Sequence, residues 1–167
     1  METNEILSSF QIYGHHKGFY NEHDIDSALS NIKVEDFIDV PDTEFPYNSA
    51  FALLRGSCHL FALALEKVLG YNPYIIEGNN KKGFHAFCQI YKNGTWFYVD
   101  ARGITSSFDE FMDVAKEFVT DEYTIRTVNS ADIDEWKKYD EYFDLALLFA
   151  MRVIKKYSNY YDCDSKQ

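Results

Sequence analysis

The feature that most constrains the fold is a change in the period of the apolar residues near the middle of the chain. The stretch RGSCHLFALALEKVLG, residues 55–70, places apolar side chains at helical spacing, with Ser57 as the expected N-cap and Gly70 as the expected C-terminal cap. After Gly70 the apolar residues alternate, which is typical of β-strands. We therefore predict an α+β domain in which a core helix carrying Cys58 packs on a small antiparallel sheet.

Three strands are expected in the alternating segment. They cover residues 72–78, 84–91 and 96–103, and Gly103 is expected to end the third strand. Asn93-Gly94 lies between the second and third strands and favours a two-residue hairpin, because both residues tolerate the left-handed turn positions. The second and third strands are therefore predicted to be adjacent and antiparallel.

The register of this hairpin can be counted from its turn. Lys92 pairs with Thr95, and the same count places His85 opposite Arg102. Asp100 then becomes a diagonal neighbour of His85 on the same face of the sheet, within reach of a cross-strand contact. The offset of two residues between Asp100 and the position opposite His85 is within what a bulge or an error in register allows.

The whole chain, residues 1–167, is predicted to form a single domain with flanking N- and C-terminal helices. Its catalytic core is expected at residues 51–128, preceded by an N-terminal extension at 1–50 and followed by a long C-terminal helix at 132–158. The length is sufficient to bury a substantial core.

The N-terminal extension gives weaker signals. Residues 6–13 are compatible with a short helix or a strand, and the segment HHKGFYNEHDID is polar and turn-like around Gly18. A helical pattern covers residues 25–38, and Pro41 is expected to stop it.

Beyond the sheet, residues 108–119 are predicted to form a helix and residues 123–128 a strand. Asp132 and Glu135 resemble a capping box at the start of the C-terminal helix. The last ten residues are expected to fray.

Composition and charge exclude several classes of protein. The chain is 46% apolar and 17% aromatic, but its most apolar run is too short to cross a bilayer and no signal peptide is visible. We therefore expect a soluble, cytoplasmic protein. The net charge of −11 argues against direct binding to nucleic acid, which requires basic residues, and leaves a basic protein partner as an alternative to a purely solubilising role.

Cys58, His85 and Asp100 form the candidate catalytic set. A cysteine at a helix N-terminus beside an imidazolium favours the nucleophilic thiolate. His85 would hold this ion pair and later protonate the leaving group, and Asp100 would fix the orientation of the imidazole. The structural alternatives are that Cys58 is a small buried apolar residue, that His85 packs across the strands and that Asp100 ends a strand.

The segment at residues 55–103 resembles the transglutaminase-like branch of the papain-like cysteine protease superfamily. The resemblance is carried by G-x-C at a helix start, by His-Ala-Phe on a strand and by an aromatic-rich strand ending in Val-Asp. Arg55-Gly-Ser-Cys58 is also similar, more distantly, to the signature of the arylamine N-acetyltransferases. The resemblance implies a papain-like fold, a Cys-His-Asp triad and chemistry through a thioester acyl-enzyme.

Other residues have weaker claims. Asn48 is a candidate oxyanion contact because it is an amide in the loop before the helix, and His59 and Arg102 are candidate substrate contacts or structural residues. Cys88 is expected on the opposite face of its strand from His85, in the core, and Cys163 is expected to be incidental.

Three cysteines without a C-x-x-C pair indicate neither a disulfide framework nor a zinc site, and no metal or cofactor is expected. The alternative is a metal site at the N-terminal histidines and their acidic neighbours, although their spacing matches no regular ligand motif: His15, His16, His23, Glu22 and Asp24.

The leading hypothesis is a cysteine-dependent enzyme that acts on the amide or acyl bond of a peptide, a protein or a small molecule, by hydrolysis, deamidation or acyl transfer. The alternative is a catalytically inactive acidic binding or inhibitor protein, directed at a basic nucleic-acid-binding partner. A structural protein of a larger assembly, held by the C-terminal helix, is the third hypothesis.

Overall fold

The structure is a computed structural model that describes residues 15–120 and 122–163. The element expected at residues 6–13 lies outside these described residues. The described residues form six strands, six α-helices and three 3₁₀ segments. They follow in this order: β1 His16–Gly18, η1 Phe19–Asn21, α2 Ile25–Ser30, η2 Val34–Asp36, η3 Ala50–Leu53, α3 Cys58–Leu69, β2 Pro73–Gly78, β3 Phe84–Lys92, β4 Thr95–Asp100, β5 Gly103–Thr105, α4 Phe108–Phe111, β6 Tyr123–Thr127, α5 Ser130–Tyr139, α6 Phe143–Lys156 and α7 Ser158–Tyr161.

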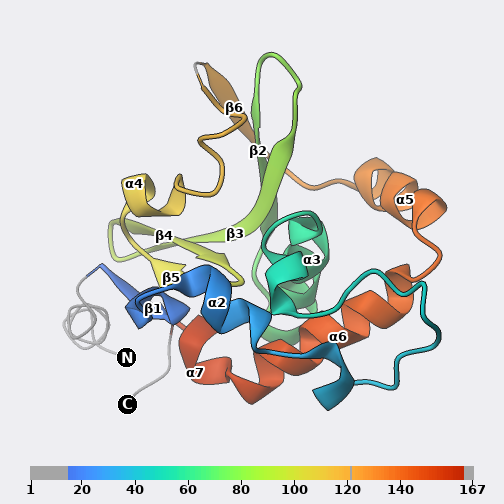
Figure 1. The fold of residues 1–167 in the computed structure, drawn as a ribbon. Coiled ribbons are helices and arrows are strands. Elements are labelled where there is room, and N and C mark those ends of the chain that lie inside the picture. Colours follow the sequence, from blue (N-terminus) through green and yellow to red (C-terminus); the bar gives the residue numbers. More distant parts are fainter. Residues whose placement is uncertain (1–14, 121, 164–167) are drawn as a thin grey trace.

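The helices are labelled α2 to α7, as in Figure 1. The six strands form one antiparallel sheet in the order β1-β5-β4-β3-β2-β6. Figure 1 shows α3 beside this sheet, and α6 packs against α3. This arrangement confirms the α+β class and the core helix packed on an antiparallel sheet.

Helix α3 begins at Cys58 and ends at Leu69, as its apolar period predicted, and it buries its face against β3 and α6. Gly70 ends the helix with a φ of 76°, which confirms the expected glycine cap. The prediction that the Ser57 side chain caps the first turn is wrong, because no such hydrogen bond is formed. The Ser57 side chain hydrogen-bonds Tyr47 instead.

The hairpin of β3 and β4 has the predicted register, with Lys92 opposite Thr95. Asn93 and Gly94 make its turn with φ values of 54° and 82°. The third predicted strand is shorter than expected. It ends at Asp100, and Gly103 begins β5 rather than ending β4.

Gly103 allows this reversal and the arrival of a further strand. Its φ is 123°, and a Cβ atom there would lie 2.2 Å from the carbonyl oxygen of Lys17 in β1. The prediction of a turn around Gly18 is wrong, because the segment forms strand β1 followed by the 3₁₀ segment η1. The polar sequence concealed the strand, because β1 is only three residues long and pairs with a strand far away in the sequence.

The two faces of β3 pack into different cores. Ala86 and Cys88 belong to the main core with α3, whereas Phe87 belongs to a smaller core with Phe111 of α4. This alternation confirms that Cys88 is buried on the face opposite to that of residues 85 and 87. The main core also includes Phe19 and other side chains of the expected N-terminal extension.

Two predicted helices are shorter in the structure. The helix expected at residues 25–38 ends at Ser30, because Lys33 forms a bridge with Ser49 and draws the backbone into an extended conformation. The helix expected at residues 108–119 ends at Phe111, and hydrogen-bonded turns follow it.

The long helix expected at residues 132–158 is also wrong, because the chain breaks at Asp140 into α5 and α6. The capping box uses Asn129 and Asp132 rather than Asp132 and Glu135. The end of the described chain is not frayed: α7 follows α6, and Tyr161 is buried with its hydroxyl donating to the carbonyl oxygen of Ala101. None of the described helices has the length and apolar character that crossing a membrane would require.

Candidate active site

Cys58 lies at the first position of α3, and its side chain points at the start of β3. The residue is 6% exposed. The backbone N–H of Ala86 donates a hydrogen bond to the Cys58 Sγ atom over 3.2 Å. A peptide N–H directed at sulfur stabilises negative charge there. The thiol is therefore held in place by the strand that also carries His85.

His85 joins Cys58 to Asp100. Its Nε2 atom lies 3.0 Å from Oδ2 of Asp100, and both side chains are buried. The two residues are diagonal neighbours, as predicted, because the register places Asp100 opposite residue 87. The imidazole also hydrogen-bonds the Cys58 side chain.

The charge state of His85 follows from these two partners. Burial lowers the pKa of the imidazole, but the negative charge of Cys58 and the hydrogen bonds to Asp100 and Cys58 outweigh it and raise the pKa to about 9. His85 thus favours its protonated form when Cys58 is a thiolate. The sequence prediction that these three side chains meet agrees with the geometry.

Asp100 is held by a second partner, Arg102. The guanidinium contacts both carboxylate oxygens, with Nε 3.0 Å from Oδ1 and Nη2 2.7 Å from Oδ2, and the Arg102 backbone N–H also donates to Oδ1 over 3.0 Å. Burial alone would raise the pKa of Asp100, but Arg102 and the hydrogen bond from His85 hold it well below its ordinary value. Asp100 is therefore a carboxylate when it orients His85.

Arg102 is itself enclosed. Its guanidinium donates to the carbonyl oxygens of Glu110 and Phe111 and lies over the ring of Tyr20, 5.1 Å from the centroid. Sequence reasoning missed Tyr20, since it lies in another part of the chain and no local pattern links it to Arg102. The Tyr20 hydroxyl is buried and has no hydrogen-bond partner among the described residues.

A cleft of about 360 Å³ gives access to Cys58 and His85. Its walls come from the loop before α3, the start of β3 and the turns after α4. The residues that line it are Leu54, Arg55, Gly56, Cys58, Gly83, Phe84, His85, Val114, Glu117 and Phe118. The apolar residues of the turns after α4 were not predicted as site residues, because the sequence signals for that segment indicated a regular helix.

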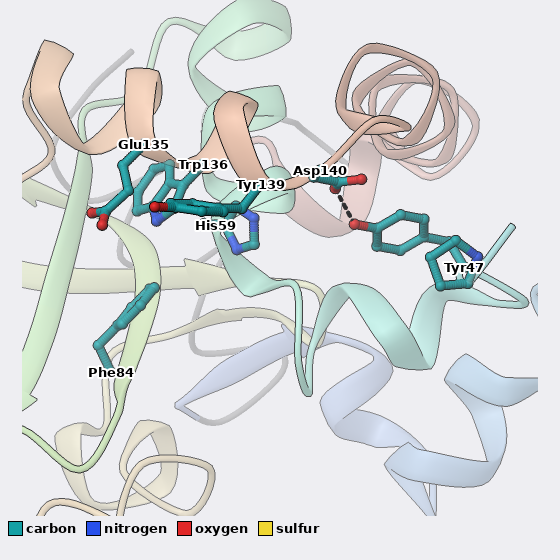
Figure 2. Close-up of a pocket in the computed structure, with 8 residues that line it drawn as sticks. Tyr47, His59, Phe84, Glu135, Trp136, Tyr139 and Asp140 are labelled. Carbon is teal, nitrogen blue, oxygen red and sulfur yellow. Dashed lines mark hydrogen bonds between the residues drawn. The ribbon is translucent and has the colours of Figure 1, made fainter.

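The other predicted site residues lie elsewhere. Asn48 is exposed, its carbonyl oxygen accepts from the Val34 N–H, and it does not line the cleft. Arg102 lies behind Asp100 and does not line the cleft either. His59 points into a different cavity, beside Trp136 (Figure 2).

The remaining cysteines and histidines do not join the site. Cys88 donates to the carbonyl oxygen of Ala62 inside the main core. Cys163 is buried rather than lying in a loose tail. His16 pairs with Glu110, Nδ1 to Oε2 over 2.9 Å. Within residues 15–120 and 122–163, no three side chains of His, Cys, Asp or Glu are grouped as a metal site requires.

Comparisons with models of protein families, with curated proteins and with solved structures found no match to this chain. What the site does must therefore be inferred from its own geometry.

Proposed function

We propose that this chain is a thiol enzyme that acts on an amide or related acyl bond, with Cys58 as nucleophile, His85 as proton donor and acceptor, and Asp100 as the residue that orients His85. The observation that carries the proposal is the continuous contact from Cys58 through His85 to Asp100 at the bottom of a cleft. Residues with a purely structural role would not require a thiol, an imidazole and a carboxylate in contact, in this order, beside an open cavity.

The first half of the reaction forms a thioester. The Cys58 thiolate attacks the carbonyl carbon, so that a C–S bond forms and the negative charge moves to the carbonyl oxygen. No side chain caps the first turn of α3, so the backbone N–H groups of Cys58 and His59 are the candidates to stabilise this oxyanion, whereas the Leu60 N–H donates to the carbonyl oxygen of Ser57. The C–N bond then breaks, and the imidazolium of His85 gives its proton to the leaving amine.

The second half of the reaction restores the thiol. A water molecule attacks the thioester while the neutral imidazole of His85 accepts its proton, and the C–S bond breaks to release a carboxylic acid. An amine in place of water gives a new amide. Hydrolysis and acyl transfer therefore use the same residues, and the second substrate decides between them.

The transglutaminase-like assignment is part of this proposal. Its support is that the nucleophile begins a core helix, the histidine lies on a following strand and the aspartate ends the strand paired with it. A papain-like fold is proposed on the same ground.

The test is the pH dependence of iodoacetamide labelling at Cys58, Cys88 and Cys163, followed by peptide mass mapping. We expect selective labelling of Cys58 at about pH 6, where an ordinary thiol with a pKa near 8.5 reacts slowly. Because all three cysteines are buried, the quantity to compare is the shape of each pH profile rather than the absolute rate.

His85→Ala is the decisive control. It opens more space beside Cys58, so a purely steric effect would make labelling faster. Loss of the imidazolium instead predicts slower labelling at about pH 6. If Cys58 labels as slowly as an ordinary thiol with and without His85, the enzyme proposal is wrong and an acidic binding protein becomes the better hypothesis.

A further inference from the structure

A second cavity lies beside the candidate active site, on the far side of Phe84. Its volume is about 560 Å³, which is within the range of small-molecule sites. Figure 2 shows it between α5 and the segment that leads into α3. The residues that line it are Pro46, Tyr47, His59, Phe84, Glu135, Trp136, Tyr139 and Asp140.

The walls of this cavity are aromatic. Trp136 contacts His59 with ring centroids 4.8 Å apart, and it stacks on Phe84 with centroids 6.0 Å apart. Tyr139 is 76% exposed, so the part of its ring that Lys138 does not cover is open to a ligand. Aromatic faces carry a negative quadrupole and therefore attract cations.

The charged groups of the cavity are acidic. Glu135 and Asp140 line it, and no lysine or arginine does so among the described residues. The Tyr47 hydroxyl donates to Asp140, whereas Glu135 makes no ion pair with any described residue. Burial lowers the pKa of His59 to about 4, so its imidazole is neutral at physiological pH and does not repel a cation.

The two lysines of α5, Lys137 and Lys138, do not line the cavity. The Lys138 ammonium lies over the ring of Tyr139, 5.4 Å from its centroid, and Lys138 is not among the lining residues. This cation–π contact shows that an exposed aromatic ring of α5 attracts a cation within the protein itself.

The cavity adjoins the candidate nucleophile through the chain itself. His59 follows Cys58, and Phe84 precedes His85 and lines both cavities. A peptide with its carbonyl carbon at Cys58 therefore has a neighbouring position from which a side chain reaches past Phe84.

We propose that this cavity binds the cationic side chain, arginine or lysine, of a basic substrate residue that neighbours the attacked carbonyl. The aromatic walls would contact the stem and the face of the cation, and Glu135 would supply the opposite charge at the rim. The link to a substrate rests on the proposed function, whereas the binding of the cation does not.

Binding is tested without catalysis, in a Cys58→Ala protein whose other tryptophan is removed by Trp96→Phe, so that the emission reports Trp136. The probes are Nα-acetyl-arginine amide, Nα-acetyl-lysine amide and Nα-acetyl-citrulline amide, the last of which has the shape of arginine without its charge. We expect the arginine or lysine probe to bind at least about fivefold more tightly than citrulline.

Glu135→Gln should remove most of that preference, and Asp134→Asn should retain it, because Asp134 is an exposed acidic neighbour on α5 that does not line the cavity. Equal binding of the charged and neutral probes, or no saturable change in Trp136 emission with any probe, overturns the proposal.

The link to Cys58 is tested with N-chloroacetyl derivatives of arginine amide and citrulline amide on the protein with Cys58 intact. The thiolate displaces chloride, so a C–S bond forms as the C–Cl bond breaks. We expect faster labelling by the arginine compound, and no such preference in Glu135→Gln. Equal rates, measured relative to iodoacetamide, would overturn the link to the substrate. If the labelling of Cys58 by iodoacetamide instead shows the pH dependence of an ordinary thiol, that result counts against the proposed function and not against the binding of a cation in the cavity.

Discussion

Removing the guanidinium behind Asp100 should cost far more stability than removing an equally well-bonded one at the surface. The substitution is Arg102→Met, which keeps most of the side-chain volume. Arg102 is 3% exposed, and it makes a two-point contact with Asp100 and two further hydrogen bonds to backbone carbonyl groups. The variant leaves a buried carboxylate and these carbonyl groups without their partner.

The expected loss is about 3–5 kcal/mol of unfolding free energy, the usual cost of removing one partner from a buried ion pair. The pH dependence follows from Asp100, whose pKa in the folded protein is below the ordinary value. Its stabilising contribution is present above the ordinary pKa near 3.8 and is lost as the pH falls through the folded-state value. The difference between wild type and variant should therefore be largest near neutral pH and shrink in acid.

The chain offers a matched control in Arg126→Met. Arg126 also makes a two-point contact with a carboxylate, Nη1 to Asp132 Oδ2 over 2.8 Å and Nη2 to Oδ1 over 3.0 Å, but its side chain is 40% exposed. Because water screens this pair, the expected loss is about 0–1 kcal/mol. The two variants have similar hydrogen-bond geometry and differ in burial.

The assay is urea unfolding followed by circular dichroism. If Arg102→Met proves too unstable to study, the double variant Asp100→Asn with Arg102→Met removes both charges and should be more stable than Arg102→Met alone. Losses of the same small size for Arg102→Met and Arg126→Met would refute the reasoning, as would a double variant less stable than Arg102→Met.

Two further predictions concern His59 and Gly103. Burial lowers the pKa of His59 to about 4, so between pH 6.5 and 4 the unfolded chain takes up a proton that the folded protein excludes, and stability falls with the pH. His59→Gln should lessen this loss by about 2 kcal/mol, measured as the change in unfolding free energy from pH 7 to 4.5, and an unchanged pH dependence would contradict it. Gly103→Ala should cost more than about 2 kcal/mol, because its Cβ atom would lie 2.2 Å from the Lys17 carbonyl oxygen. Gly94 has a φ of 82°, but a Cβ atom added there would meet no atom within 4 Å, so Gly94→Ala should cost only about 1 kcal/mol. Equal shifts in the urea midpoint for Gly103→Ala and Gly94→Ala would exclude the steric explanation.

The candidate triad could be predicted because the signals that position it are local. The apolar period defines α3 and places Cys58 at its start, and the Asn93-Gly94 turn fixes the register that makes His85 and Asp100 diagonal neighbours. A short turn allows only one pairing of the two strands that keeps their apolar faces buried. The turn and the alternation of apolar residues were therefore sufficient to predict the register.

The breaks in the expected helices could not be predicted in the same way. Apolar spacing continues across Asp140, and nothing in the local sequence requires the chain to stop there. In the structure, Asp140 accepts from the Tyr47 hydroxyl and the Tyr142 N–H, and the backbone adopts an extended conformation. The local bond from Tyr142 and the contact with Tyr47, which is distant in the sequence, together override the helical preference at Asp140.

The sequence by itself determined the core helix, the hairpin and the order of Cys58, His85 and Asp100, because these depend on spacing within neighbouring segments. Only the tertiary structure decided that Arg102 supports Asp100 rather than facing the cleft. It also decided that His59 and Trp136 share an aromatic cavity. His59 and Trp136 are far apart in the chain, and the position of Arg102 is fixed by Tyr20, which is also distant in the sequence, so burial in a common core rather than any local pattern brings these residues together.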